Sequence, residues 1–134
     1  MTNCHFKVLI IDNDRDMVKF LRLYLDKKGI KSVGVHSVTE ALGVYDPNSF
    51  DAIVADVCLE RFSGVSLLKS IRGRGDLIPV IMMSAYATRE MAQECLVLGA
   101  HDFLFKPFRL AVLEEILRGI HVRKQRLIHM GVML

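Results

Sequence analysis

Four apolar runs of the chain each end in polar side chains that could carry chemistry. Asp12 and Asn13 follow the first run, and Asp56, Ser84 and Lys106 follow three later runs. Removing a carboxylate from water is costly unless the charge is paired, so an acid at the end of a buried strand is rarely there for packing. The position of Asp56 therefore indicates a reacting group.

The chain between these residues predicts five strands that alternate with five helices. Apolar runs indicate strands at 7–11, 31–36, 53–56, 78–83 and 102–105. Helical spacing and capping residues indicate helices at 15–28, 38–45, 65–72, 89–98 and from near 109 past 126. This alternation predicts a doubly wound α/β fold, with a parallel sheet covered by helices on both faces. Ligands of such sheets bind at the carboxyl ends of the strands, so we expect the polar ends to meet on one rim.

The expected rim favours phosphoryl transfer to a carboxylate. Asp12 and Asp56 would repel each other in a partly desolvated cleft, so the site needs a counter-charge. Hard carboxylate oxygens without His or Cys side-chain ligands suit Mg²⁺, which accepts one or two carboxylates together with phosphate. The metal and Lys106 would balance the charge of a phosphoryl group, and Ser84 could donate a hydrogen bond to it. A carboxylate that is ionised at neutral pH needs no general base, and Asp56 is the predicted nucleophile.

Other site chemistries and other protein classes fit the sequence less well. Ser84 does not lie on the G-x-S-x-G turn of a hydrolase, and the turn at 12–14 lacks the glycines of a nucleotide-binding loop. The length of 134 residues fits one domain. The net charge of +3 is better explained by a solvated helix face than by a nucleic-acid site. No apolar run approaches the roughly 20 residues that span a bilayer. Three widely spaced cysteines without a C-x-x-C pair (Cys4, Cys58 and Cys95) favour a reducing cytoplasm.

Several segments together resemble the receiver domains of two-component response regulators. The matching segments are 8–14, 56–64, 84–85 and 99–108, within a resemblance that extends from about residue 7 to about residue 117. The resemblance implies a flavodoxin-like sheet of order 2-1-3-4-5 and a signalling domain that catalyses at most its own phosphorylation and dephosphorylation. It also implies a sensor histidine kinase as partner, whose phosphohistidine donates the phosphoryl group to Asp56.

The same resemblance implies a role for each matching residue. Asp12, Asn13 and Asp56 would bind Mg²⁺ together with the backbone carbonyl of Cys58. The remaining roles would be a switch hydroxyl, a switch aromatic residue and a charge partner of the phosphoryl group, at Ser84, Phe103 and Lys106 respectively. The bond between Lys106 and Pro107 is expected to be cis. Phosphorylation would then change the face made by the fourth and fifth helices and the fifth strand.

Two departures from the family pattern and two alternative functions stay open. Asn13 replaces a second acid, which predicts weaker Mg²⁺ binding, and Glu60 replaces a common proline, which predicts a less rigid loop. One alternative is a pseudo-receiver that keeps the fold as an interaction module without phosphorylation. The other is a phosphatase similar to the haloacid dehalogenases, with Asp12 as nucleophile, although nothing after Lys106 matches the late acidic pair that those enzymes carry.

The last helix raises the question of self-association. Its apolar residues follow the 3-4 spacing of a coiled-coil seam, with a lysine at one core position: Leu110, Leu113, Leu117, Ile120, Lys124 and Leu127. We expect a receiver domain over residues 1–120, and over 121–134 an extension of the helix that begins a linker to a missing output domain. The first three residues of this series would pack on the domain itself, and the apolar side chains beyond Ile120 would need a partner. A homodimer would form through this helix or through the face of the fourth and fifth helices and fifth strand. Nucleic acid would be contacted only by the output domain, and no membrane contact is expected.

Overall fold

The computed structural model describes residues 6–59 and 63–132. Its strands are β1 (Lys7–Ile11), β2 (Lys31–Val35), β3 (Ala52–Asp56), β4 (Val80–Ser84) and β5 (Asp102–Phe105). Its helices are α1 (Arg15–Lys27), α2 (Val38–Val44), α3 (Gly64–Gly73), α4 (Arg89–Val97) and α5 (Leu110–His129). All strand pairs are parallel, in the order β2-β1-β3-β4-β5. The predicted fold and strand order are confirmed.

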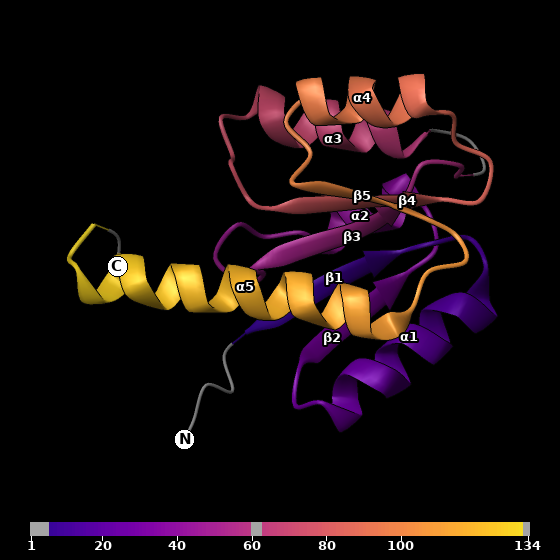
Figure 1. Cartoon of the computed structure of the whole chain (residues 1–134). Coiled ribbons are helices and arrows are strands. Elements are labelled where there is room, and N and C mark those ends of the chain that lie inside the picture. The colour runs from indigo at the N-terminus through magenta and orange to yellow at the C-terminus, as the bar shows by residue number, and fades with distance from the viewer. Residues whose placement is uncertain (1–5, 60–62, 133–134) are drawn as a thin grey trace.

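The sheet lies between two apolar layers, because its central strands are apolar on both faces (Figure 1). Leu9 and Ile11 of β1 pack with α2, α3 and α4, whereas Val8 and Ile10 of the same strand pack with α1 and α5. Every residue of β3 and β4 is buried. The strand ends are therefore held by a rigid core on both sides.

Polar caps set the ends of several elements. The side chain of Asp14 accepts hydrogen bonds from the Asp16 and Met17 N–H groups and caps α1. The predicted start of β4 at Ile78 is wrong, because the Asp76 side chain takes the Ile78 N–H at 3.0 Å and Pro79 has no N–H to donate.

Helix α5 is longer than the sheet beneath it, and its last part projects past the amino ends of the strands (Figure 1). Leu113, Leu117 and Ile120 are buried against the domain's own sheet. Lys124 forms an ion pair with Asp51, in the segment that leads into β3. The domain itself therefore covers most of the predicted seam. Within the described residues, no helix has the length and apolar character needed to cross a bilayer.

Candidate functional site

The carboxyl ends of adjacent strands bring the predicted residues to one rim. Asp12 follows β1, Asp56 and Ser84 are the last residues of β3 and β4, and Lys106 follows β5. The Lys106 ammonium group lies 2.7 Å from Asp12 Oδ2 and 2.7 Å from Asp56 Oδ2. Asp12 is completely buried, and Asp56 is 6% exposed. One lysine therefore bridges two buried carboxylates from separate strands.

Main-chain donors fix the other oxygen of each carboxylate. The Asp14 N–H donates to Asp12 Oδ1 at 3.0 Å, and the Cys58 N–H donates to Asp56 Oδ1 at 2.8 Å. All four carboxylate oxygens thus have a hydrogen-bond partner. These short-range bonds orient both groups toward the rim. Asp14, considered above as a cap, therefore also supports Asp12 through its backbone.

The charges of this cluster do not balance. Two carboxylates face one ammonium group, which leaves one negative charge if all three are ionised. Burial raises the pKa of Asp12, and the neighbouring Asp56 adds to this, while the hydrogen bonds from Lys106 and Asp14 act in the opposite direction. Burial acts to lower the pKa of Lys106, but the hydrogen bonds and charges of Asp12 and Asp56 outweigh it and raise this pKa. The lysine therefore stays protonated and can pair with both carboxylates.

The donor set at the rim fits Mg²⁺. Nowhere in the described ranges do three or more His, Cys, Asp or Glu residues gather as a metal site. The available oxygens are those of two carboxylates, the Asn13 amide and the Cys58 carbonyl, all of them hard ligands. Asn13 is exposed directly beside the buried Asp12. These residues could hold the ion, but Asn13 contributes no negative charge.

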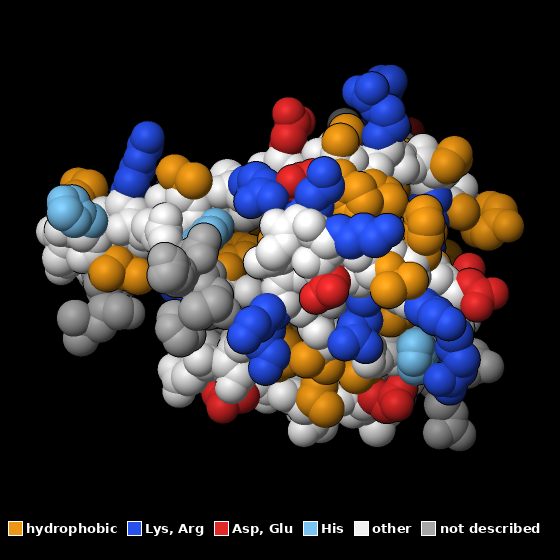
Figure 2. All heavy atoms as spheres, turned by 90° about the horizontal axis from the view of Figure 1, so that it is seen from below, with side chains coloured by type: hydrophobic (Ala, Val, Ile, Leu, Met, Phe, Trp, Pro, Cys, Tyr) orange, Lys and Arg blue, Asp and Glu red, His pale blue; other side chains and the backbone are white. Residues whose placement is uncertain are grey.

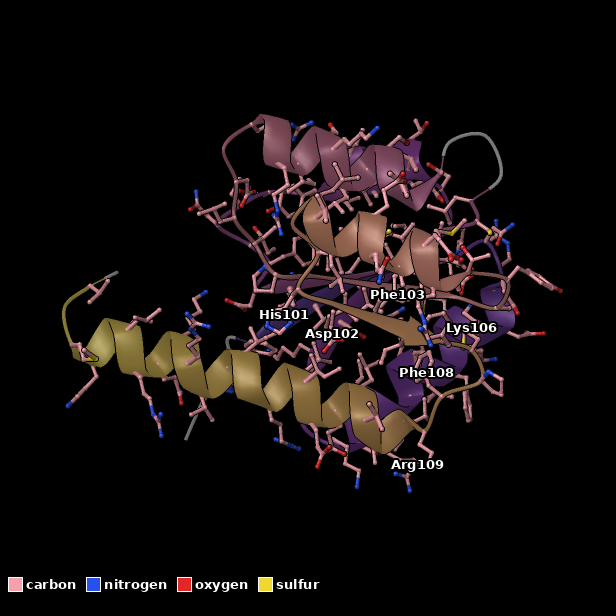
Figure 3. All side chains as sticks on the ribbon, turned by 45° about the horizontal axis from the view of Figure 1, so that its top comes forward. His101, Asp102, Phe103, Lys106, Phe108 and Arg109 are labelled. Carbon is pink, nitrogen blue, oxygen red and sulfur yellow. The ribbon has the colours of Figure 1, made fainter. Side chains whose placement is uncertain are left out.

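Ser84 and Phe103 lie beneath the rim. The Ser84 hydroxyl is buried, accepts a hydrogen bond from the Tyr86 N–H at 3.2 Å and lies 3.9 Å from Cys58 Sγ. The Phe103 ring is 9% exposed and belongs to the core between the sheet and α4 (Figure 3). Its neighbour Phe105, with ring centroids 5.1 Å apart, is 49% exposed. The buried ring and the exposed ring therefore share the short strand β5.

The loop around Asp56 depends on a glycine that the sequence argument did not single out. A Cβ atom at Gly64 would lie 2.2 Å from the Asp56 carbonyl oxygen, so no larger residue fits unless the backbone moves. The Gly64 N–H also donates to the Val57 carbonyl at 2.8 Å. The expected cis bond between Lys106 and Pro107 is confirmed. The prediction for Glu60 lies outside the described residues.

The fold and the rim define a doubly wound α/β domain with an acidic site at the carboxyl ends of its strands. Residues 8–118 match the response regulator receiver domain, and the chain belongs to this family. It is 33% identical over 124 residues to the transcriptional regulatory protein CpxR of Klebsiella pneumoniae, covering 90% of this chain and 53% of that protein. It is 32% identical over 126 residues to the transcriptional regulatory protein ZraR of Escherichia coli O157:H7, covering 91% of this chain and 29% of ZraR.

Solved structures agree with this assignment. A two-component response regulator from Clostridium difficile superimposes with a TM-score of 0.82 at 30% identity, covering 89% of this chain and 98% of that one. The receiver domain of the Francisella response regulator 1452 gives a TM-score of 0.80 at 29% identity, covering 88% and 98%. The chain thus spans about half or less of the two relatives above but nearly the whole of these two solved chains.

Proposed function

We propose that Asp56 accepts a phosphoryl group from the phosphohistidine of a sensor histidine kinase. Response regulators partner with such kinases, and the chain belongs to their receiver family. The observation that carries the proposal is the Asp56 carboxylate itself. It lies at the rim with Lys106 2.7 Å from one oxygen and a main-chain N–H on the other. This arrangement orients an ionised carboxylate and provides a cation for an incoming phosphoryl group.

In the proposed reaction, an Asp56 oxygen forms a bond to phosphorus while the phosphorus–nitrogen bond of phosphohistidine breaks. The bonding electrons stay on the imidazole, and the product on Asp56 is an acyl phosphate. Lys106 moves from its shared position to pair with a phosphoryl oxygen. Receiver domains generally bind Mg²⁺, and here Asp12, Asn13, Asp56 and the Cys58 carbonyl would hold an ion that neutralises phosphoryl charge.

The signal would then leave the site through Ser84. Its hydroxyl accepts one main-chain N–H at present and can rotate to donate to a phosphoryl oxygen. That rotation changes the space next to β5, whose Phe103 is buried and whose Phe105 is exposed. The proposed output surface is the face made by α4, β5 and α5, with Phe103 as the switch residue.

Intact mass spectrometry after incubation with acetyl phosphate and Mg²⁺ tests the acceptor. The wild-type chain should gain one phosphoryl group, and Asp56→Asn should gain none. Peptide mapping of the labelled carboxylate separates Asp56 from Asp12, which would carry the label in a phosphatase similar to the haloacid dehalogenases. No gain in the wild-type chain would instead identify a pseudo-receiver, and the proposal would fail.

The Mg²⁺ affinity should be limited by Asn13. Two carboxylates share one ammonium group, so a divalent cation meets only one net negative charge. Asn13→Asp adds a second, and we expect it to bind Mg²⁺ about tenfold more tightly, equivalent to about 1.4 kcal/mol. Calorimetric titration measures this directly. Equal affinity in the two proteins would show that the exposed position does not reach the ion.

We further propose that residues 1–120 form the receiver unit and that 121–134 extend its last helix toward an output domain, which alone would contact nucleic acid. A cytoplasmic location is typical of the family. Since α5 uses Leu113, Leu117 and Ile120 for its own domain, the α4-β5-α5 face is the better candidate for a homodimer. Sedimentation with and without beryllofluoride tests this; a monomer in both conditions would exclude the dimer.

A further inference from the structure

His36 contacts the acidic rim, although none of the steps described so far uses it. It follows the last residue of β2, as Asp12 follows the last residue of β1. Its Nδ1 atom lies 3.1 Å from the Asp12 carbonyl oxygen. The Asp12 N–H donates to the Val35 carbonyl at 3.2 Å. The end of β2 therefore holds the main chain of Asp12 at both its donor and its acceptor.

The contact with the Asp12 carbonyl requires a proton on Nδ1 of His36. A carbonyl oxygen can only accept a hydrogen bond, so the ring nitrogen must be the donor. The neutral Nδ1–H tautomer and the imidazolium both carry this proton, and the bond forms with either. Among the hydrogen bonds of the described residues, the Asp12 carbonyl accepts no other. Loss of the imidazole would therefore leave this carbonyl free to turn.

The carbonyl that His36 holds belongs to the peptide group between Asp12 and Asn13. A peptide group is planar, so a fixed oxygen also fixes the direction in which the chain enters Asn13. The Asn13 side chain is exposed, and its position depends on this main chain. Because Asn13 brings no charge to a cation, its contribution depends on being held in place before the ion arrives. The bond from His36 supplies this order.

The first turn of α2 places His36 in turn. The His36 N–H donates to Glu40 Oε1 at 2.9 Å, and the Glu40 N–H donates to Ser37 Oγ at 3.1 Å. These two bonds join His36 and the cap residue Ser37 to the start of the helix. A continuous series of hydrogen bonds therefore runs from α2 through His36 to the main chain of Asp12.

The surroundings of His36 do not favour it as a metal ligand. His36 lines a hollow of about 440 Å³ between α1 and β2. Among the described residues that line this hollow, Asp26 is the one acid, and it is outnumbered by the basic residues Arg15, Lys19 and Arg22. Figure 2 shows that basic side chains are common on the face of the molecule that carries α1 and α5. Basic neighbours repel a cation, so His36 acts on the rim through Asp12.

We propose that His36 is a positioning residue of the cation site, an inference that rests on the proposed function. Its imidazole holds the Asp12–Asn13 peptide group in the conformation that binds Mg²⁺ and so supports phosphorylation of Asp56. Residues that orient metal ligands from outside the ligand set commonly change metal affinity when they are replaced. His36 adds β2 to the strands that build the site.

Two substitutions of similar size separate this role from packing. Asparagine carries an amide nitrogen at the same number of bonds from Cα as Nδ1, whereas leucine has a similar shape and no donor. Calorimetric titration should show that His36→Leu weakens Mg²⁺ binding about tenfold and that His36→Asn stays within about twofold of the wild type. In the metal-free proteins, the amide signals of Asn13 and Asp14 should shift in His36→Leu and return in His36→Asn. Equal Mg²⁺ affinity in the wild type and His36→Leu, or no recovery in His36→Asn, would overturn the proposal.

Two further variants control for general effects. His101→Leu removes an exposed imidazole at the other end of the sheet and should leave the Mg²⁺ affinity unchanged. Glu40→Ala removes the acceptor of the His36 N–H and should weaken Mg²⁺ binding about threefold. If His36→Leu does not fold, Glu40→Ala provides the test, and an unchanged affinity would overturn the proposal.

Labelling with acetyl phosphate distinguishes the role of His36 from the proposed function. A wild-type chain that gains no phosphoryl group on Asp56 would overturn the proposed function, while its Mg²⁺ affinity would still test His36. If the wild type and His36→Leu gain the group at the same rate and with the same dependence on Mg²⁺, only the role of His36 is wrong. A wild-type chain that binds no Mg²⁺ would overturn the role of His36 as well.

Discussion

The two ends of the sheet treat their acidic side chains in opposite ways. At the carboxyl end, Asp12 and Asp56 share the single ammonium group of Lys106. At the amino end, Asp51 has its own partners in Lys124 and the Lys7 N–H. The carboxyl end therefore has one positive charge fewer than its two carboxylates need, whereas Asp51 at the amino end has a lysine of its own.

Asp76, the second acidic residue at the amino end, also has hydrogen-bond partners. Asp76 accepts hydrogen bonds from the Tyr45 hydroxyl and the Ile78 N–H. Burial, together with the hydrogen bond to Asp76, raises the pKa of Tyr45, so this hydroxyl stays protonated at neutral pH. Arg72 ties the same region together by donating to the carbonyls of Asp76 and Gly99. The carboxylates at the carboxyl end are hydrogen-bonded as fully, so the difference between the two ends is that Asp12 and Asp56 share one ammonium group.

Removing Lys106 should have the largest effect on this contrast. Lys106→Met leaves two buried carboxylates without a cation, which should lower the free energy of unfolding by about 3 kcal/mol at neutral pH. The pKa of Asp12 is raised in the folded state, so this carboxyl takes up a proton at a higher pH than an ordinary aspartate does. Its protonation removes one of the two buried charges that the variant leaves without a cation. The loss should therefore shrink as pH falls from about 7 to about 5. Urea unfolding at both pH values measures it.

Removing an acid from the same cluster is the matched control. Asp12→Asn removes one of the two negative charges and leaves Lys106 paired with Asp56. The free energy of unfolding should therefore stay equal or rise. If Asp12→Asn lowers the free energy of unfolding as much as Lys106→Met does, the cluster acts as a simple structural ion pair. The contrast between the two ends of the sheet would then disappear.

Removing Asp76 should cost less and leave the chemistry intact. Asp76→Ala deprives the Tyr45 hydroxyl and the Ile78 N–H of their acceptor, at a cost of about 2 kcal/mol. Phosphorylation by acetyl phosphate should proceed at the wild-type rate, because the site lies at the other end of the sheet. Tyr45→Phe is the control and should lose about 1 kcal/mol. If Asp76→Ala unfolds like the wild-type protein but no longer accepts a phosphoryl group, the two ends of the sheet are coupled.

The fold and the convergence of Asp12, Asp56, Ser84 and Lys106 were predictable, because apolar runs place strands and polar residues mark their carboxyl ends. The main-chain N–H groups that donate hydrogen bonds at the site could not be predicted from the sequence. Nothing in the residue types indicates that the Cys58 N–H holds Asp56, and only a close packing contact reveals the requirement for Gly64. The roles of Asp56 and Ser84 in phosphoryl transfer stay predictions.

The periodicity of α5 shows a second limit. Spacing of 3 and 4 residues identifies an apolar stripe but not the surface that covers it. Leu113 and Leu117 pack on their own sheet, as expected, and Ile120 packs there with them. Lys124 occupies a seam position because it reaches Asp51, a partner 73 residues away that no local pattern identifies. Tertiary packing, not helix spacing, decides between a dimer seam and a core.

The smallest effect is expected at this Lys124–Asp51 pair, although it joins opposite charges as Lys106 does. The Lys124 side chain is 40% exposed, compared with 14% for Lys106, so water screens the pair more strongly. Asp51 also keeps its hydrogen bond from the Lys7 N–H at 2.8 Å when the lysine is removed. Lys124→Met should therefore lower the free energy of unfolding by less than about 1 kcal/mol, and added salt should reduce the difference further. A loss near that of Lys106→Met would mean that exposure does not distinguish the two lysines. The different behaviour of the two ends of the sheet would then need another cause.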